Sequence, residues 1–279
     1  MTDLKIYPIK VNESRLNRVD KGILPSIPFL MCIIGRVKAG KSILLNSLAL
    51  SPRFYGDDFQ IKVLISPTAH SDPVNEHMVK DFDFVFTEYN DELLDNLLNL
   101  IEEDESKDKW LIIFDDIIGN MDQKKAGKVD GITALSTKYR HIGNENFEGK
   151  LSIMIATQYF KFLSPILRNN CSAYFLMGSY SQMELKKISE ALSFFGGGET
   201  EFLKLYKKSR QKPHDFLYLS VEQLKAHRNF DEELWDGDDA IEFDIPDMSC
   251  PNKEDEEGDS NNKKILLSKE PQSMKDHKK

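Results

Sequence analysis

The sequence of 279 residues has little cysteine, no long apolar run and no excess of positive charge. Its three cysteines, Cys32, Cys171 and Cys250, have no paired spacing and no histidine at ligand spacing, which excludes a disulfide framework and a zinc site. No apolar stretch is long enough to span a bilayer, and the chain does not open with the apolar segment of a secretion signal. We therefore expect an intracellular protein without a membrane span.

The net charge of −9 belongs to one end of the chain. Residues 231–279 hold 16 acidic and 7 basic side chains, whereas residues 1–230 hold 30 of each sign. The segment E-D-E-E-G-D at 254–259 has few apolar neighbours to bury, which predicts disorder. We therefore expect a folded domain over 1–230 and an acidic low-complexity tail over 231–279. Two apolar stretches within this tail, 234–235 and 241–245, are candidates for docking on a partner.

Residues 35–42, G-R-V-K-A-G-K-S, match the phosphate-binding pattern G-x-x-x-x-G-K-[ST]. A continuous apolar run at 29–34 precedes them, as in a buried parallel strand, and a helical pattern at 43–50 follows. In this motif the glycines let the backbone approach a phosphate, while N–H groups and the helix N-terminus supply positive potential. Lys41 is expected on the β- and γ-phosphates and Ser42 on Mg²⁺. The predicted nucleotide-binding residues are Gly35, Lys38, Ala39, Gly40, Lys41 and Ser42.

The rest of 1–230 alternates apolar runs with helical patterns. Strands are expected at 61–66, 83–87, 110–114, 151–156 and 173–177, with 216–219 at an edge of the sheet. Helices are expected at 91–103, 133–141, 181–192 and 200–208. Such alternation predicts an α/β fold with a mostly parallel central sheet and helices on both faces. Together with the phosphate-binding motif, this fold is expected to be that of a P-loop NTPase. Ligands of such sheets bind beyond the carboxyl ends of the strands.

A second motif, W-L-I-I-F-D-D at 110–116, runs from an apolar strand directly into two acids, as in a Walker B strand. Asp115 is expected to hold Mg²⁺ together with Ser42. Asp116 is then placed to polarise the water that attacks the γ-phosphate. The alternative is that both acids only cap a following helix. The phosphate-binding motif upstream favours the catalytic interpretation.

Three more side chains are candidates for the reaction. Gln158 ends the strand expected at 151–156 and is a candidate sensor of the γ-phosphate or of the attacking water. Arg140 and Arg168 are candidate arginine fingers, which stabilise transition-state charge in a neighbouring subunit. The alternative for each arginine is a solvated surface residue or a local salt bridge. Arg140 is slightly preferred.

Two further patterns raise the possibility of a GTPase. Residues 116–119 fit D-x-x-G, and residues 252–255 fit N-K-x-D. The second motif reads guanine only from the end of a buried strand, and here it lies in the acidic tail with no strand before it. We interpret that match as accidental, and the acidic pair at 115–116 suits an ATPase better.

Taken together, these motifs resemble the poxvirus-type genome-packaging ATPases of large DNA viruses, a branch of the FtsK–HerA superfamily. The resemblance covers about 30–220 and rests on G-R-V-K-A-G-K-S (35–42), L-I-I-F-D-D (111–116), Y-R-H (139–141), I-M-I-A-T-Q (153–158) and P-I-L-R-N-N (165–170). It implies a homo-oligomeric ring that hydrolyses ATP with Mg²⁺ to drive double-stranded DNA into a preformed capsid. A capsid or portal-like viral protein is the implied partner. The implied location is the host-cell cytoplasm, a viral factory or the virion.

Contacts with DNA have modest support in the sequence. Lys124, Lys125 and Lys128 lie in the loop after the acidic strand and are candidates for contacts with DNA phosphates, although a basic run is more often a solvated surface. Two other functions stay open at this stage. One is a P-loop NTPase or small-molecule kinase that does not act on DNA, and the other is an assembly protein that uses the nucleotide as a switch.

Overall fold

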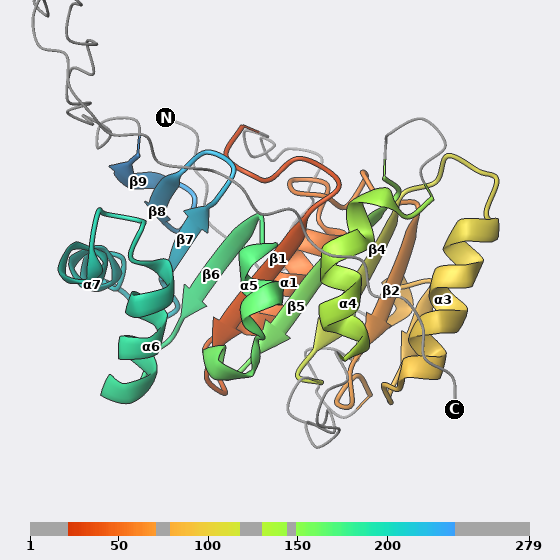
Figure 1. Cartoon of the computed structure of the whole chain (residues 1–279), viewed down its shortest axis with the longest axis horizontal. Helices are drawn as coiled ribbons and strands as arrows, with labels where there is room; N and C mark the ends of the chain where they lie inside the picture. The colour runs from red at the N-terminus through yellow and green to blue at the C-terminus, as the bar shows by residue number, and fades with distance from the viewer. Residues whose placement is uncertain (1–21, 71–78, 118–129, 144–148, 238–279) are drawn as a thin grey trace, which may run out of the picture. The chain divides into compact units, whose positions relative to one another are not determined.

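The computed structural model describes residues 22–70, 79–117, 130–143 and 149–237. These residues form a nine-stranded sheet in the order β3-β2-β4-β5-β1-β6-β7-β8-β9 (Figure 1). The strands are β1 (Leu30–Gly35), β2 (Ile61–Ile65), β3 (Phe84–Phe86), β4 (Trp110–Asp115), β5 (Leu151–Thr157), β6 (Ala173–Met177), β7 (Phe216–Ser220), β8 (Lys225–Arg228) and β9 (Glu232–Asp236). The helices are α1 (Lys41–Leu50), α3 (Asp91–Glu103), α4 (Gly131–Lys138), α5 (Pro165–Asn169), α6 (Gln182–Leu192) and α7 (Glu199–Lys208). Short 3₁₀ turns are η2 (Val79–Asp81), η4 (Tyr139–His141) and η5 (Phe160–Phe162).

The sheet is parallel from β3 to β6 and antiparallel from β6 to β9. The carboxyl ends of β2, β4, β5, β1 and β6 therefore meet at one edge of the sheet. β5 lies between the strand that enters the phosphate-binding motif, β1, and the acidic strand, β4. The predicted α/β fold with a mostly parallel sheet is confirmed, and the order and direction of the strands place the end of β1, the two acids after β4 and Gln158 after β5 at this carboxyl edge.

Helices cover both faces of the sheet, and β1 shows why its sequence is apolar throughout. Leu30, Cys32 and Ile34 pack with residues of α3 to α7 on one face. Met31 and Ile33 pack with residues of α1 on the other face. All six residues of β1 are buried. In Figure 1, α3, α4 and α5 lie in front of the sheet and α1 behind it.

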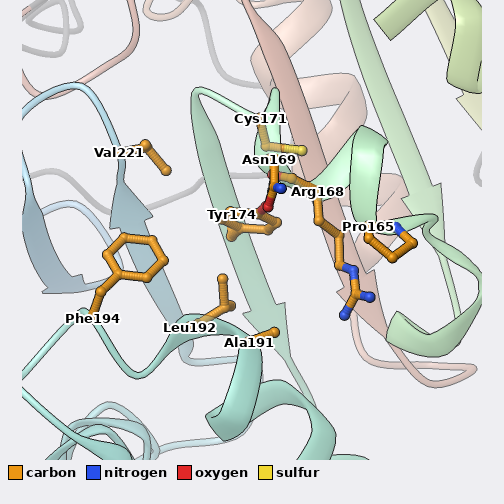
Figure 2. A pocket seen from close by; sticks show the side chains of 9 residues that line it. All are labelled: Pro165, Arg168, Asn169, Cys171, Tyr174, Ala191, Leu192, Phe194 and Val221. Carbon is orange, nitrogen blue, oxygen red and sulfur yellow. The ribbon is translucent and has the colours of Figure 1, made fainter. Parts of the chain in front are cut away.

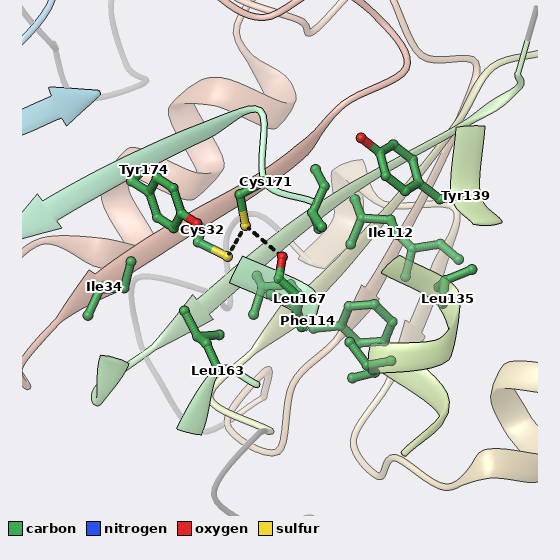
Figure 3. Packing of buried hydrophobic residues seen from close by; sticks show 14 of the residues in the cluster. Cys32, Ile34, Ile112, Phe114, Leu135, Tyr139, Leu163, Leu167, Cys171 and Tyr174 are labelled. Carbon is green, nitrogen blue, oxygen red and sulfur yellow. Dashed lines mark hydrogen bonds between the residues drawn. The ribbon is translucent and has the colours of Figure 1, made fainter. Parts of the chain in front are cut away.

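The face covered by α3 to α7 contains two of the cysteines (Figure 3). Cys32 Sγ lies 3.2 Å from Cys171 Sγ, and the Cys171 thiol also donates to the carbonyl oxygen of Leu167 at 3.4 Å. Both thiols are free. Burial raises the pKa of Cys32 well above its ordinary value, so this side chain stays a neutral thiol. It therefore acts as a small apolar residue of the core.

The last strands in the chain differ from the expectation. β7 is not an edge strand, because β8 and β9 continue the sheet beyond it. The domain boundary expected at 230 is therefore too early, since β9 extends to Asp236. Leu234 and Trp235 are partly buried against the core and are not part of a free docking segment. These strands were missed because K-A-H-R and E-E-L-W-D are short and rich in charge, without an apolar run.

Several predictions fall outside the described residues. These are the tail from residue 238 onward, the apolar stretch 241–245, the N-K-x-D match at 252–255, Cys250, and the three lysines Lys124, Lys125 and Lys128. Within the described part of the chain, none of the helices combines the length and the apolar character that crossing a membrane requires.

Candidate functional site

Residues 35–42 run from the last residue of β1 through a tight loop into the first two residues of α1, and the two glycines of this segment are required by geometry. A Cβ atom added to Gly35 would lie 2.9 Å from the Cβ atom of Met177, so no larger residue fits there. Gly40 has φ +99° and is the N-cap of α1, in the left-handed region that glycine adopts readily. Lys38 shares this backbone region, with φ +63°. The loop therefore curls back on itself and leads directly into the helix N-terminus.

The N-terminus of α1 keeps its positive electrostatic potential. No side chain caps it, and no acidic residue lies in its first turn. The unpaired N–H groups of the first turn and the helix dipole therefore favour an anion beside Gly40, Lys41 and Ser42. Ser42 is the second residue of α1 and is half-buried, so its hydroxyl lies next to this end of the helix.

Lys41 forms an ion pair that connects the phosphate-binding loop with Asp116, the residue after β4. Its side chain is only 7% exposed, and its Nζ lies 3.8 Å from Asp116 Oδ2. A buried ammonium group requires compensation by negative charge. The contact therefore places one cation and one carboxylate beside the helix N-terminus.

Asp116 points toward the loop because of its own backbone conformation. Its φ is +53°, and its N–H donates to the carbonyl oxygen of Ala156 on β5 at 3.0 Å. The left-handed turn redirects the chain after β4. Gln158, which follows β5 directly, donates from Nε2 to Asp116 Oδ2 at 3.2 Å. The structure thus brings Lys41, Asp116 and Gln158 together, as the sequence motifs anticipated.

Asp115, the last residue of β4, is buried and has a partner that the sequence analysis missed. Ser66 Oγ donates to Asp115 Oδ2 at 3.1 Å. Ser66 is completely buried and follows β2, the strand that pairs with β4. The sequence contained a signal for Ser66, because a polar residue that directly follows an apolar strand of a parallel sheet lies at the edge where ligands bind. The hydroxyl holds one oxygen of the Asp115 carboxylate in place.

A second missed residue is His214. Its Nδ1 lies 3.4 Å from the carbonyl oxygen of Ala39, although the two residues are 175 positions apart. Nothing in the sequence around His214 signals this contact, because it depends on the antiparallel pairing of β7 with β6. The side chain is exposed and lies against the phosphate-binding loop.

Of the two candidate arginines, Arg140 lies far from the loop. It belongs to η4, and Lys150 donates its N–H to Ile142 just before β5 begins. Arg140 is therefore at the amino end of β5, at the edge opposite the loop. Its Nε donates to the Tyr139 hydroxyl at 2.9 Å, and its guanidinium lies 5.4 Å from the Tyr139 ring.

Arg168, on α5, lies closer to the carboxyl edge. Its guanidinium carbon lies 4.8 Å from the ring centre of Phe160, which follows the end of β5 by three residues. Arg168 also lines a pocket of about 330 Å³ between α5, β6 and the end of α6 (Figure 2). Its Nε is buried and has no hydrogen-bond partner among the described residues. The other lining residues are Pro165, Asn169, Cys171, Tyr174, Ala191, Leu192, Phe194 and Val221.

A buried strand, a loop bounded by two glycines, a helix N-terminus and an acidic strand one strand removed from β1 in a parallel sheet are the elements of the P-loop NTPase fold. The structure is similar to that of the genome packaging NTPase B204 from Sulfolobus turreted icosahedral virus 2 in complex with AMP. The TM-score is 0.54 at 18% identity, covering 73% of this chain and 98% of that chain. For the complex of B204 with ATP-gammaS the TM-score is 0.52 at 18% identity, covering 72% of this chain and 96% of that chain.

A further structure, of B204 described as the DNA-packaging ATPase from Sulfolobus turreted icosahedral virus, gives a TM-score of 0.53 at 18% identity. It covers 71% of this chain and 96% of that chain. No protein-family model matches the sequence, and no curated protein matches it. At this level of identity the likeness is one of fold, and it extends over nearly the whole of the viral NTPase.

Proposed function

We propose that this chain is an ATP-hydrolysing DNA translocase that packages double-stranded viral DNA into a preformed capsid. The observation that carries the proposal is the grouping of Lys41, Asp116 and Gln158 beside the N-terminus of α1. A cation, a carboxylate and an amide at a phosphate-binding loop are the groups that nucleotide hydrolysis requires. The likeness to B204 over 98% of its length supports packaging as the process that uses this hydrolysis.

The proposed roles follow from the positions of the side chains. N–H groups of the loop and of the first turn of α1 bind the phosphates, and Lys41 neutralises their charge. Asp116 accepts a hydrogen bond from the attacking water and orients it, while Gln158 holds the Asp116 carboxylate. These residues suit an in-line attack on the γ-phosphate, which needs positioning and charge stabilisation rather than a covalent intermediate.

Magnesium is the cofactor that these residues suit. Ser42 and Asp115 would hold it, because a hydroxyl and a carboxylate are hard oxygen ligands and Mg²⁺ usually takes few protein ligands. The hydrogen bond from Ser66 to Asp115 Oδ2 supports this role, since it orients the carboxylate at the end of β4. When bound, Mg²⁺ would neutralise phosphate charge.

The proposal includes a homo-oligomeric ring that acts on DNA and on a capsid or portal-like protein, in the host-cell cytoplasm, a viral factory or the virion. The candidate DNA contacts remain Lys124, Lys125 and Lys128. The proposed organisation is a P-loop ATPase domain that ends after β9, followed by an acidic tail.

Steady-state ATP hydrolysis with and without long double-stranded DNA tests this function. DNA should increase the rate, and the increase should weaken steeply between about 50 mM and 200 mM salt, because phosphate contacts release counterions. The Lys41→Ala variant serves as the blank for contaminating activity. A rate that is robust but indifferent to DNA would exclude the translocase and favour a small-molecule kinase. Nucleotide binding without turnover would favour a nucleotide-switched assembly protein.

The arginine that acts across the ring can be identified by mixing variants. We expect Arg168 rather than Arg140, since Arg140 is held by Tyr139 at the opposite edge of the sheet. Arg168→Ala and Lys41→Ala should each be impaired alone. Mixed in equal amounts, they should regain activity well above their average, because a Lys41→Ala subunit supplies Arg168 to its neighbour's intact loop. The same mixture made with Arg140→Ala is the matched comparison. Recovery only in the Arg140 mixture would reverse the assignment.

A further inference from the structure

The loop before β7 carries an exposed histidine against the phosphate-binding loop. His214 Nδ1 lies 3.4 Å from the carbonyl oxygen of Ala39. A Cβ atom added to Gly40 would lie 3.5 Å from the same nitrogen, so the ring lies beside both residues. β7 is antiparallel to β6, with Phe216 opposite Met177, and its amino end is therefore at the carboxyl edge of the sheet. This pairing is what brings His214 to the loop.

The segment that holds His214 is rigidly built around the buried Asp215. The Asp215 carboxylate accepts the N–H groups of Gln211 and Lys212, at 3.2 and 2.8 Å, on Oδ2. Its Oδ1 accepts a hydrogen bond from Asn229 Nδ2 at 3.1 Å, and Asn229 also binds the N–H of Phe216. His214 itself has φ +67°, a conformation that few residues other than glycine adopt. These hydrogen bonds therefore hold the backbone that carries the exposed ring, and the ring itself lies against Ala39.

The strand order indicates which part of a nucleotide meets this ring. β5 and β4, which carry Gln158 and Asp116, lie on one side of β1, whereas β6 and β7 lie on the other. In the proposed function the γ-phosphate lies near Asp116 and Gln158. A nucleoside triphosphate is elongated, so its nucleoside end extends from the loop toward the side of β6 and β7. His214 is on that side.

We propose that His214 forms one wall of the nucleoside subsite and that the nucleobase packs on its imidazole ring. This inference rests on the proposed function, because the orientation of the triphosphate comes from the groups assigned to hydrolysis. A flat aromatic ring binds a base through its face, without hydrogen bonds to the base edge. The contact therefore adds affinity for the nucleoside part of the ligand and leaves the phosphate contacts unchanged.

Binding affinities measured separately for ATP and for inorganic tripolyphosphate distinguish the nucleoside subsite from the phosphate subsite. The dissociation constants of both ligands are measured by calorimetry for the wild-type chain and for His214→Asn. Asparagine tolerates the left-handed backbone better than alanine, so this change removes the ring with little strain. We expect ATP to bind about 10-fold more weakly, in line with base–aromatic stacking, and tripolyphosphate to bind as before. His70→Asn, at an exposed histidine elsewhere, is the matched control.

Each other result is informative. An equal loss of affinity for both ligands would overturn the inference, since it would assign His214 to the shape of the phosphate-binding loop. Unchanged ATP affinity in His214→Asn would overturn it as well. Lys41→Ala should weaken the binding of both ligands. If it leaves both dissociation constants unchanged, the proposed function fails regardless of the result for His214→Asn. His214→Gly replaces the asparagine variant if the latter lowers the melting temperature, because glycine adopts a positive φ most readily.

Discussion

Replacement of Lys41 by alanine should lower the rate of ATP hydrolysis by about 10³-fold or more, because it removes a preorganised cation from the phosphate-binding loop. Lys41 is almost completely buried, and its Nζ lies 3.8 Å from the carboxylate assigned to the attacking water. A charge in such a site is screened little by solvent, so it stabilises developing phosphate charge strongly. ATP binding should weaken too, since Lys41 contacts the phosphates of the bound ground state in the proposed function.

The fold should tolerate this change. The Asp116 side chain is 29% exposed, and it keeps its hydrogen bond with Gln158 when Lys41 is removed. The melting temperature of Lys41→Ala should therefore stay within about 5 °C of the wild-type value, as expected for a loss near 1 kcal/mol. Lys187→Ala, at an exposed position on α6, controls for the loss of one positive charge. Turnover within a few-fold of wild type in Lys41→Ala would show that hydrolysis occurs elsewhere or comes from a contaminant.

Much of this site was predictable, because its motifs are continuous in sequence. Residues 30–42 and 110–116 each combine a buried strand with the polar residues at its end. A parallel sheet brings such ends to one edge whatever the length of the chain between them. The sequence therefore predicted that Lys41, Asp116 and Gln158 would meet, although they come from three different strands or their loops.

The remaining contacts depend on pairings that leave no local pattern. Ser66 meets Asp115 across 49 residues because β2 pairs with β4. His214 reaches Ala39 only because β7 runs antiparallel to β6, a reversal that the apolar run of β7 does not reveal. The weak apolar content of β8 and β9 concealed the rest of that antiparallel extension. Local periodicity predicts elements, whereas the order and direction of strands decide which loops meet.

Replacement of Asp116 by asparagine should lower kcat by roughly 10²- to 10⁴-fold, the usual range for removal of a general base. The change is well suited to the backbone, since Asp116 has φ +53° and asparagine tolerates this region. The side chain keeps its shape, and an amide oxygen still accepts the hydrogen bond from Gln158. ATP should bind as tightly as before or more tightly, because a negative charge near the phosphates has been removed.

Measurement of kcat together with the dissociation constant of ATP separates this role from a structural one. A structural defect would raise the dissociation constant and lower the melting temperature, whereas loss of the base lowers kcat alone. Asp81→Asn, at an exposed carboxylate in η2, is the matched control and should retain full activity. If Asp116→Asn kept its turnover, the water would have to be positioned by another group, and Asp115 would be the next residue to examine.

The contacts of the Asp116 carboxylate sharpen this prediction. Both Lys41 Nζ and Gln158 Nε2 approach the same oxygen, Oδ2. They orient the carboxylate, and in the proposed function Oδ1 is the oxygen that meets the water. Gln158 then acts largely through Asp116, and residues that act as a unit have non-additive effects. The double variant Gln158→Leu, Asp116→Asn should be hardly slower than Asp116→Asn alone. Losses that multiply in the double variant would instead give Gln158 an independent contact with the γ-phosphate.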